Sequence, residues 1–404
     1  MLTLDELNAL IAAALPAREK GSESIALHDA PGRILAEDLL SPLAIPGADV
    51  SAMDGYAFYH DGSTRLALAG ESIAGKPFAG TLQAGECVRI MTGAVVPEGA
   101  DTVEMQENVA REGDHIVLQH PAKTGKHIRR AGEEVKPGDA VLAAGQILSA
   151  ADILLLAALG QAQVTVRKRL KIGIFSTGDE LVAPGAALTA SGQIYDSNRA
   201  LLIALLQELP VDIIDGGIVR DDPAAIKQTL TDMGAHCDAI LTSGGVSVGD
   251  YDFLKDAVAA LGEIQSYKVK MKPGKPFVFG RVGNAAYFGL PGNPVSSFVG
   301  FSRIVRPALW QMAGADPAPA PFSLVVPLAA PVRKAPGRQD FQRGLLQQTA
   351  NGWQVAPQGA QDSHRIYGLA RANCLIDLAA DSGDVAAGDA VTVWPFFSRF
   401  AGGG

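Results

Sequence analysis

Three glycine-containing turns combine hydroxyl, amide or carboxylate groups directly after apolar, strand-like runs. They are FSTGDE at 175–180, TSGGVSVG at 242–249 and FGLPGNP at 288–294. In open α/β sheets, ligands bind beyond the carboxyl ends of the strands, where glycine lets backbone N–H groups and helix N-termini approach an anion. Each turn alone is explained equally well as a tight turn. Three together predict one anion-binding crevice.

Carboxylates accompany the same turns. They are Asp179, Glu180, Asp221, Asp222, Asp250 and Asp252. Oxygen ligands of this kind hold Mg²⁺, which keeps several waters and joins one or two carboxylates to ligand phosphates. Asp222 precedes Pro223, so we expect it to cap a helix. For Glu180, Asp221 and Asp252 we expect a functional role.

Four lysines lie within eight residues, at Lys268, Lys270, Lys272 and Lys275. If residues 267–272 are extended, the first three side chains project to one face, with Val269 and Met271 on the other. The alternative is a solvated strand face. The chain has 34 Lys and Arg against 43 Asp and Glu, a net charge of −9, so this local concentration of positive charge favours an oxyanion site.

Composition limits the remaining classes of function. The net charge of −9 disfavours a broad nucleic-acid or acidic-lipid surface, and 48% hydrophobic with 19% charged residues is typical of a folded chain. The longest uncharged apolar stretch, 153–160, is far short of the roughly 20 residues that a membrane span needs. The early residues Asp5 and Glu6 are unlike a secretory signal, so we expect a cytoplasmic protein. Three isolated cysteines indicate buried free thiols.

The pattern of elements predicts several domains. Thr3 and Glu6 form a capping box for a helix over 3–15, and Ser149 caps an apolar helix ending near Leu159. Short runs broken by Gly and Pro predict a β-rich domain over about 40–140. Strands alternating with helices over 170–310 predict a mostly parallel, doubly wound α/β domain. An Ala/Pro-rich linker after Trp310 then precedes a C-terminal β module.

Eight motifs carry a resemblance to a known family. They are SAMDGYA (51–57), IMTGA (90–94), VPEGAD (96–101), IRRAGE (128–133), STGDEL (176–181), TSGGVSVG (242–249), KPGKP (272–276) and LPGNP (290–294). In this order they resemble the motifs of the molybdopterin molybdenumtransferases, relatives of the gephyrin E domain. The C-terminal module resembles the family more loosely, through GRQDFQRG (337–344) and AGDAV (387–391).

The resemblance implies a reaction in which adenylylated molybdopterin and molybdate, with Mg²⁺, give molybdenum cofactor and AMP. By motif position, the oxyanions would be held by Lys268, Lys272 and Lys275, and Mg²⁺ and the adenylate by Glu180, Asp221 and Asp252. The residues that would bind the pterin or phosphate are Thr177, Gly178, Ser243, Gly244, Gly245, Ser247, Pro291, Asn293 and Pro294, with Arg343 and Ser363 as contacts from the last module. The choice between Asp250 and Asp252 stays open.

The resemblance also implies a homodimer, in which Asp54 and Thr92 of one subunit act in the crevice of the other. It implies four domains. They are an elongated α+β domain from 1–40 with 139–168, an inserted β-rich domain at 41–138, an α/β molybdopterin-binding domain at 169–316, and a C-terminal β-barrel-like module at 317–404. The upstream adenylyltransferase and downstream molybdoenzyme chaperones are further expected partners.

Two alternatives remain. The first is the upstream adenylyltransferase that uses ATP, whose fold resembles residues 170–310 alone; the extra domains argue against it. The second is a non-catalytic cofactor-binding scaffold, which we rank lower because the lysine and carboxylate positions are filled. Molybdate and tungstate have nearly the same size and charge, so the sequence does not distinguish them.

Overall fold

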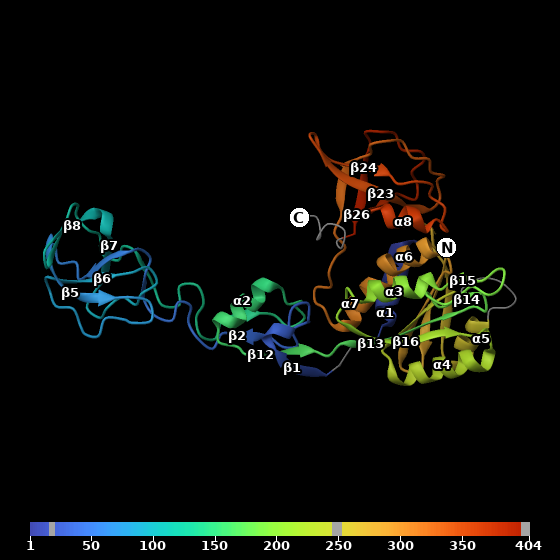
Figure 1. Ribbon diagram of the computed structural model, residues 1–404, viewed down its shortest axis with the longest axis horizontal. Coiled ribbons are helices and arrows are strands. Elements are labelled where there is room, and N and C mark those ends of the chain that lie inside the picture. Colours follow the sequence, from blue (N-terminus) through green and yellow to red (C-terminus); the bar gives the residue numbers. More distant parts are fainter. Residues whose placement is uncertain (16–20, 245–252, 397–404) are drawn as a thin grey trace.

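The computed structural model describes residues 1–15, 21–244 and 253–396. The chain forms four bodies in an elongated arrangement, with a β-rich domain at one end and an α/β domain at the other (Figure 1). Gly245, Ser247, Asp250 and Asp252, all singled out in the sequence, lie outside the described residues. Within the described ranges, no helix has the length and apolar character to cross a membrane.

The α/β domain is built on a mixed six-stranded sheet of order β16-β13-β17-β21-β20-β18. Its strands are β13 (Leu170–Thr177), β16 (Val211–Val219), β17 (Ala239–Ser243), β18 (Ile264–Lys268), β20 (Pro276–Val282) and β21 (Ala285–Leu290). The four strands β16, β13, β17 and β21 run parallel, and β20 and β18 are antiparallel additions at one edge. The predicted doubly wound, mostly parallel sheet is confirmed.

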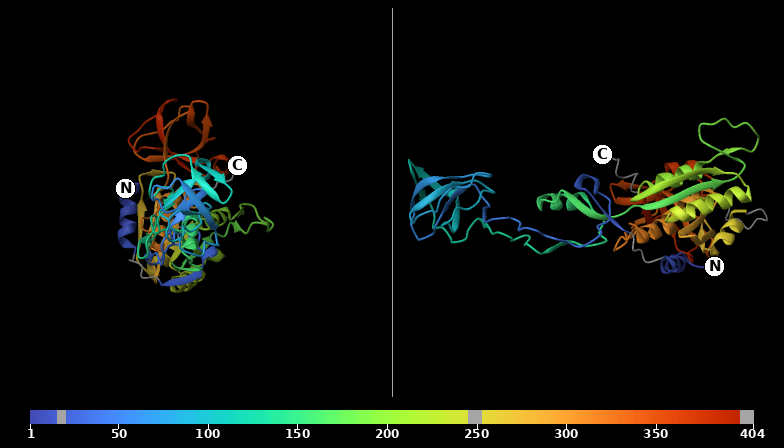
Figure 2. Two further views of the ribbon diagram at one scale, coloured as in Figure 1. Left: turned by 90° about the vertical axis from the view of Figure 1, so that its left-hand side faces the viewer. Right: turned by 90° about the horizontal axis from the view of Figure 1, so that it is seen from below.

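Helices cover both faces of this sheet. They are α3 (Ser197–Leu206), α4 (Pro223–His236), α5 (Phe253–Leu261), α6 (Pro294–Gly300) and α7 (Arg306–Ala313), with a π-helical turn η3 (Phe301–Val305) joining the last two. Residues of α3, α6, η3 and α7 form one core with the sheet, and residues of α4 and α5 form a second core on the opposite face. A short parallel pair, β14 (Leu181–Val182) and β15 (Ile194–Tyr195), carries a projecting loop (Figure 2).

The first helix, α1 (Leu4–Ala14), corrects one predicted domain boundary. Its capping box is present, with the Thr3 N–H donating to Glu6 Oε2 at 2.8 Å. We expected residues 1–40 in the elongated domain, but Leu4, Leu7 and Ile11 are buried in the same core as α7 and the α/β sheet. The apolar face of α1 therefore extends the α/β domain, because a helix packs wherever that face can be buried.

The elongated domain is made from two separated stretches of chain. Its elements are β1 (Ser22–Ala26), η1 (Leu27–Asp29), β2 (Leu39–Leu40), β11 (Ala140–Leu142), α2 (Ala150–Ala158) and β12 (Gln163–Arg167). Strand β1 pairs with β12, and β2 pairs with β11, both antiparallel. The predicted Ser149 cap of α2 is confirmed by the capping box that Ser149 forms with Asp152.

The β-rich domain contains a six-stranded sheet of order β7-β4-β6-β5-β9-β8. Its elements are β3 (Val50–Ser51), β4 (Gly55–Phe58), β5 (Arg65–Ser72), β6 (Glu86–Ile90), β7 (Thr102–Met105), η2 (Gln106–Asn108), β8 (Val109–Glu112), β9 (His115–Leu118) and β10 (Ile128–Arg129). Two chain segments lead to it side by side, visible in Figures 1 and 2 and joined by the bond from Ile45 N–H to the Val135 carbonyl at 2.8 Å.

The C-terminal module is a barrel-like sheet. Its elements are β22 (Leu324–Pro327), β23 (Gln339–Thr349), β24 (Gly352–Pro357), α8 (Ile366–Arg371), β25 (Cys374–Leu378) and β26 (Ala390–Pro395). A bridge between Leu328 and Val355 brings the chain after β22 back to β24 and so closes the circuit. A strand from the α/β segment, β19 (Met271–Lys272), pairs in parallel with β23 at the edge of this sheet.

Candidate active site

The turns after β13, β17 and β21 meet at the carboxyl edge of the parallel strands. The Gly244 N–H donates to the Leu290 carbonyl at 3.0 Å. A Cβ placed on Gly244 would lie 3.6 Å from the Thr177 carbonyl oxygen, and one on Gly292 would lie 4.0 Å from Gly244 Cα. The chain leaves β13 for β16 on one side and leaves β17 for β18 on the other, so the crevice lies at the topological switch point where α/β proteins bind ligands.

Carboxylates gather at the β13–β16 side of this crevice. The Asp221 N–H donates to Asp179 Oδ1 at 3.3 Å. Partial desolvation, together with the like charges of Asp179 and Glu180, raises the pKa of Asp221. A Cβ on Gly178 would lie 2.6 Å from Glu180 Oε2, so the Glu180 carboxylate lies directly against the Gly178 backbone. The described residues place no lysine or arginine in an ion pair with these three carboxylates.

The predicted metal ligands are Glu180, Asp221 and Asp252. The structure places the first two beside each other, whereas Asp252 is outside the described residues. Among the residues that are described, no three His, Cys, Asp or Glu side chains form a group able to hold a metal ion by themselves. The adjacent Asp222 caps α4, accepting from the Ala225 N–H at 2.8 Å, which confirms its predicted structural role.

The lysine segment differs from the single strand that the sequence suggested. The alternation is confirmed, because Val269 and Met271 are fully buried while Lys268 and Lys272 are exposed. One continuous strand is wrong, because Lys268 ends β18 in the α/β sheet whereas Lys272 belongs to β19 in the C-terminal sheet. Between the two strands, Val269 forms a bridge with Leu2, and pairing with the C-terminal sheet begins at Met271.

Lys272 and Lys275 flank a turn beside α6. A Cβ on Gly274 would lie 3.6 Å from the Ser296 carbonyl oxygen, so this turn lies next to the helix that follows the Pro291–Asn293 turn. Lys272 Nζ lies 3.3 Å from Asp340 Oδ2, an oxygen of a nearly buried carboxylate in β23. The lysine turn is therefore at the β21 side of the crevice, opposite the carboxylates.

The C-terminal module contributes backbone at the same place. The Ser363 carbonyl accepts from the Val295 N–H at 3.3 Å, so Ser363 lies at the first turn of α6, beside Pro294. Arg343 is 1% exposed, and its guanidinium donates to the Ala360 carbonyl. In this conformation Arg343 orders the 358–365 loop and does not face solvent in the crevice.

Asp54, just before β4, and Thr92, just after β6, form a pair in the β-rich domain. Figure 1 shows this domain at the other end of the molecule from the α/β domain that contains the crevice. Asp54 Oδ1 accepts from the Thr92 N–H at 2.7 Å and from the Thr92 hydroxyl at 2.8 Å. The backbone N–H of Thr92 is the largest cause that lowers the pKa of Asp54, followed by its hydroxyl. The pair is solvent-exposed, and its hydrogen bonds favour the ionised form of the Asp54 carboxylate.

Asn198, near the start of α3, is a residue at the crevice that the sequence patterns did not indicate. It is 8% exposed, and its side-chain N–H₂ donates to Ser243 Oγ at 2.7 Å and to the Gly292 carbonyl at 2.6 Å. Asn198 thus joins the turns after β17 and β21. The segment YDSNR at 195–199 shows polar residues at a helix start, a pattern that capping alone explains.

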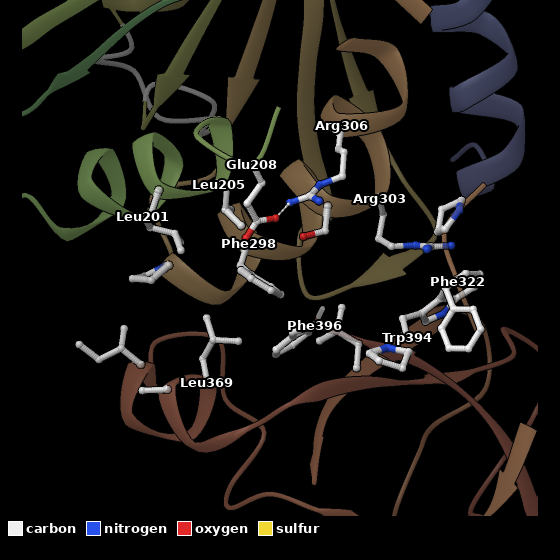
Figure 3. Close-up of a pocket in the computed structure, with 18 of the residues that line it drawn as sticks. Leu201, Leu205, Glu208, Phe298, Arg303, Arg306, Phe322, Leu369, Trp394 and Phe396 are labelled. Carbon is white, nitrogen blue, oxygen red and sulfur yellow. Dashed lines mark hydrogen bonds and ion pairs between the residues drawn. The ribbon is translucent and has the colours of Figure 1, made fainter. Parts of the chain in front are cut away.

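A pocket of about 530 Å³ lies outside the crevice, between α3, the α6–α7 helices and the C-terminal module (Figure 3). Its walls include Phe298, Phe322 and Phe396, and the Arg303 guanidinium lies 3.6 Å from the centre of a Trp394 ring. Of the predicted site residues in the described ranges, Pro294 alone lines it. The pocket is therefore separate from the predicted chemistry.

Comparisons with known proteins agree with the whole arrangement. Three family models match: the MoeA N-terminal region (domains I and II) over 2–160, a probable molybdopterin binding domain over 173–311, and the MoeA C-terminal region (domain IV) over 325–396. The solved structure of a molybdopterin biosynthesis moeA protein from Pyrococcus horikoshii superposes with a TM-score of 0.84 at 29% identity, covering 98% of this chain and all of that one.

Curated relatives extend the match over the full sequence. The molybdopterin molybdenumtransferase of Haemophilus influenzae is 42% identical over 403 residues, covering 98% of this chain and 99% of that protein. Molybdopterin molybdenumtransferase 2 of Mycobacterium tuberculosis is 37% identical over 92% of this chain and 94% of its own length. The chain therefore belongs to the molybdopterin molybdenumtransferase family of molybdenum cofactor biosynthesis.

Proposed function

We propose that this chain inserts molybdenum from molybdate into adenylylated molybdopterin, with Mg²⁺, and releases AMP. The observation that carries the proposal is the charge arrangement of the crevice. Asp179, Glu180 and Asp221 lie at its β13–β16 side, and the Lys272–Lys275 turn lies at its β21 side. One crevice thus offers a place for a cation beside a place for an oxyanion.

The reaction requires both kinds of group. Molybdate is a dianion and the pterin substrate carries phosphates, so bringing them together in a chain of net charge −9 needs local positive charge. Lysine supplies a compact point charge that suits a tetrahedral oxyanion. The glycine turns at Gly244 and Gly292 leave room for phosphate oxygens beside backbone N–H groups.

Magnesium fits the carboxylate side. Asp221 has a raised pKa beside Asp179 and Glu180, which is the state of a carboxylate group that lacks a neighbouring cation. Glu180 and Asp221 would hold the ion, with Asp252 as the third proposed ligand. A bound Mg²⁺ would offset the negative charge of the substrate phosphates. These carboxylates would hold the ion next to the Thr177–Gly178 turn.

The active unit in this proposal is a homodimer. Asp54 and Thr92 belong to the β-rich domain, which Figure 1 shows at the opposite end of the molecule from the α/β domain of the same chain. They are exposed and mutually hydrogen-bonded, as expected of a preformed loop that enters another subunit's crevice. The upstream adenylyltransferase and molybdoenzyme chaperones remain proposed partners in the cytoplasm, because they would supply the substrate and accept the product.

The decisive experiment measures AMP. Purified protein is mixed with adenylylated molybdopterin, molybdate and Mg²⁺, and AMP release is followed together with the activation of a cofactor-free molybdoenzyme. We expect AMP release that depends on both molybdate and Mg²⁺; parallel reactions with tungstate measure the preference between oxyanions. Consumption of ATP with molybdopterin would instead indicate the adenylyltransferase, and tight cofactor binding without AMP would indicate a scaffold.

A further inference from the structure

The N-cap and first turn of α3 are hydrogen-bonded to three of the parallel strands and to the turn that follows the fourth. Asp196 Oδ1 accepts from the Ser176 hydroxyl of β13 at 3.1 Å and from the Arg199 N–H at 3.2 Å. The Arg199 guanidinium reaches Asp215 of β16 at 2.6 Å. Asn198 then reaches Ser243 at the end of β17 and the Gly292 turn after β21. One helical turn is therefore hydrogen-bonded to β13, to the middle of β16, to the end of β17 and to the turn after β21.

Asn198 has a role in this turn that helix capping does not explain. Asp196 is already the N-cap of α3, through its bond from the Arg199 N–H. Both N–H groups of the Asn198 amide are directed to the crevice turns, at Ser243 Oγ and the Gly292 carbonyl. Its Oδ1 is buried and has no hydrogen-bond partner among the described residues. A buried acceptor without a partner lowers stability, so the side chain is poorly explained by stability alone.

We propose that Asn198 is a positioning residue for the substrate-binding crevice. It holds the Ser243 hydroxyl and the Gly292 turn at a fixed separation, and so preorganises the two backbone segments that receive the phosphate-bearing pterin. Asn198 acts through Ser243 and Gly292, while those two groups face the substrate. This inference rests on the proposed function, because its readout is the binding of adenylylated molybdopterin.

The test is the kinetics of full-length Asn198→Ala with adenylylated molybdopterin. We expect KM to rise about tenfold, which corresponds to about 1.4 kcal/mol, while kcat of AMP release changes by less than about threefold. Asn198→Asp keeps the shape but lacks the N–H donors and adds negative charge beside the Gly292 carbonyl, so its KM should rise further. Asn198→Ser keeps one short donor, so its KM should lie between those of wild type and Asn198→Ala. This variant replaces Asn198→Ala in the test if the alanine variant does not fold.

A double-mutant cycle separates positioning from a general loss of structure. If Asn198 acts through Ser243, the effects of Asn198→Ala and Ser243→Ala on KM will be strongly non-additive. Asn373 is a matched control, because its amide also joins two chain segments, pairing with both the N–H and the carbonyl of Leu346. Asn373→Ala should lower Tm with KM unchanged.

The outcomes distinguish this inference from the function on which it rests. Wild-type protein that releases no AMP would contradict the proposed function itself. With an active wild type, an unchanged KM in Asn198→Ala, additive effects in the cycle, or an equal KM increase in Asn373→Ala would each overturn the role of Asn198.

Discussion

Two carboxylates at opposite ends of the molecule are held in opposite electrostatic states. Asp221, at the crevice, has a raised pKa because it is partly desolvated and lies beside Asp179 and Glu180. Asp54, in the β-rich domain, has a lowered pKa because the Thr92 backbone N–H and hydroxyl both donate to it. The crevice carboxylate lies beside two like charges with no ion-paired lysine or arginine among the described residues, whereas the Asp54 carboxylate is already stabilised by its own domain.

This difference indicates how the work of binding is divided between the crevice and the Asp54–Thr92 pair. The crevice side has the groups that attract ions, at some cost to its own stability, which is a common property of binding sites. The Asp54–Thr92 side is preorganised before anything binds, as expected of a loop presented to another subunit. The predictions below test whether the two regions are two halves of one site.

The largest expected effect is that of Asp221→Asn. We expect AMP release to fall at least about 100-fold, because a main charge that organises magnesium and the adenylate is lost. The apparent Tm without Mg²⁺ should rise, because the like-charge repulsion with Asp179 and Glu180 is relieved. Asp222→Asn is the neighbouring control, since asparagine also caps helices well, and it should keep activity within about twofold. An equal loss of AMP release in Asp221→Asn and Asp222→Asn would contradict the assignment of a functional role to Asp221 and a capping role to Asp222.

Mixed dimers test whether the two regions act across subunits. Asp54→Asn and Asp221→Asn chains, each nearly inactive alone, are co-expressed with different tags. With random pairing, half of the dimers contain one complete site of two, so activity should return to about a quarter of wild type. Simple mixing of the two variants without subunit exchange is the control. No recovery in purified heterodimers would show that Asp54 does not complement the crevice of another chain.

Thr92→Val should produce a smaller loss, about tenfold in kcat/KM. It removes the hydroxyl donor at 2.8 Å but keeps the backbone N–H at 2.7 Å, so the Asp54 carboxylate remains partly held. Thr92→Ser retains the hydroxyl and should stay near wild type. The measurement is steady-state AMP release, with circular dichroism to confirm the fold. Full activity in Thr92→Val would show that the hydrogen bond from the Thr92 hydroxyl to Asp54 is not needed for catalysis.

The smallest expected effect is a magnesium-dependent change in Tm. A raised carboxyl pKa in the folded state means that stability falls as the pH rises through the acidic range in which Asp221 ionises. At pH 7, saturating Mg²⁺ should therefore raise Tm by about 2–4 °C, and this increase should shrink as the pH is lowered, because protons compete with the ion for the carboxylates. Asp54→Asn should keep this shift and Asp221→Asn should reduce it. If Asp221→Asn keeps the full Mg²⁺-dependent increase in Tm, the ion binds at a place other than the Asp221 carboxylate.

Local patterns made much of the fold predictable. The capping boxes at Thr3 and Ser149, the Asp222 cap and the three buried cysteines depend on residues near one another in sequence, and all are confirmed. The domain of α1 could not be predicted in the same way. Its apolar face shows that it packs, but the partner lies about 300 residues away, as in the bond from the Asn8 amide to the Arg303 carbonyl.

The site was predictable to the extent that strand ends carry its residues. Gly178, Ser243, Gly244 and Asn293 follow parallel strands, so the topology alone brings them together. Asn198 could not be identified, because its partners come from two other turns. The division of the lysine segment between two sheets was equally hidden, since period-two alternation continues across the change of sheet.

Strand β19 also determines how truncated forms of this chain should be interpreted. Because Met271 and Lys272 pair with Gln339 and Asp340, cutting the chain between 316 and 317 would expose an unpaired backbone edge and remove the carboxylate beside Lys272. An inactive fragment of that kind would not show that the missing module touches substrate. It would show that the lysine turn had lost the sheet that anchors it.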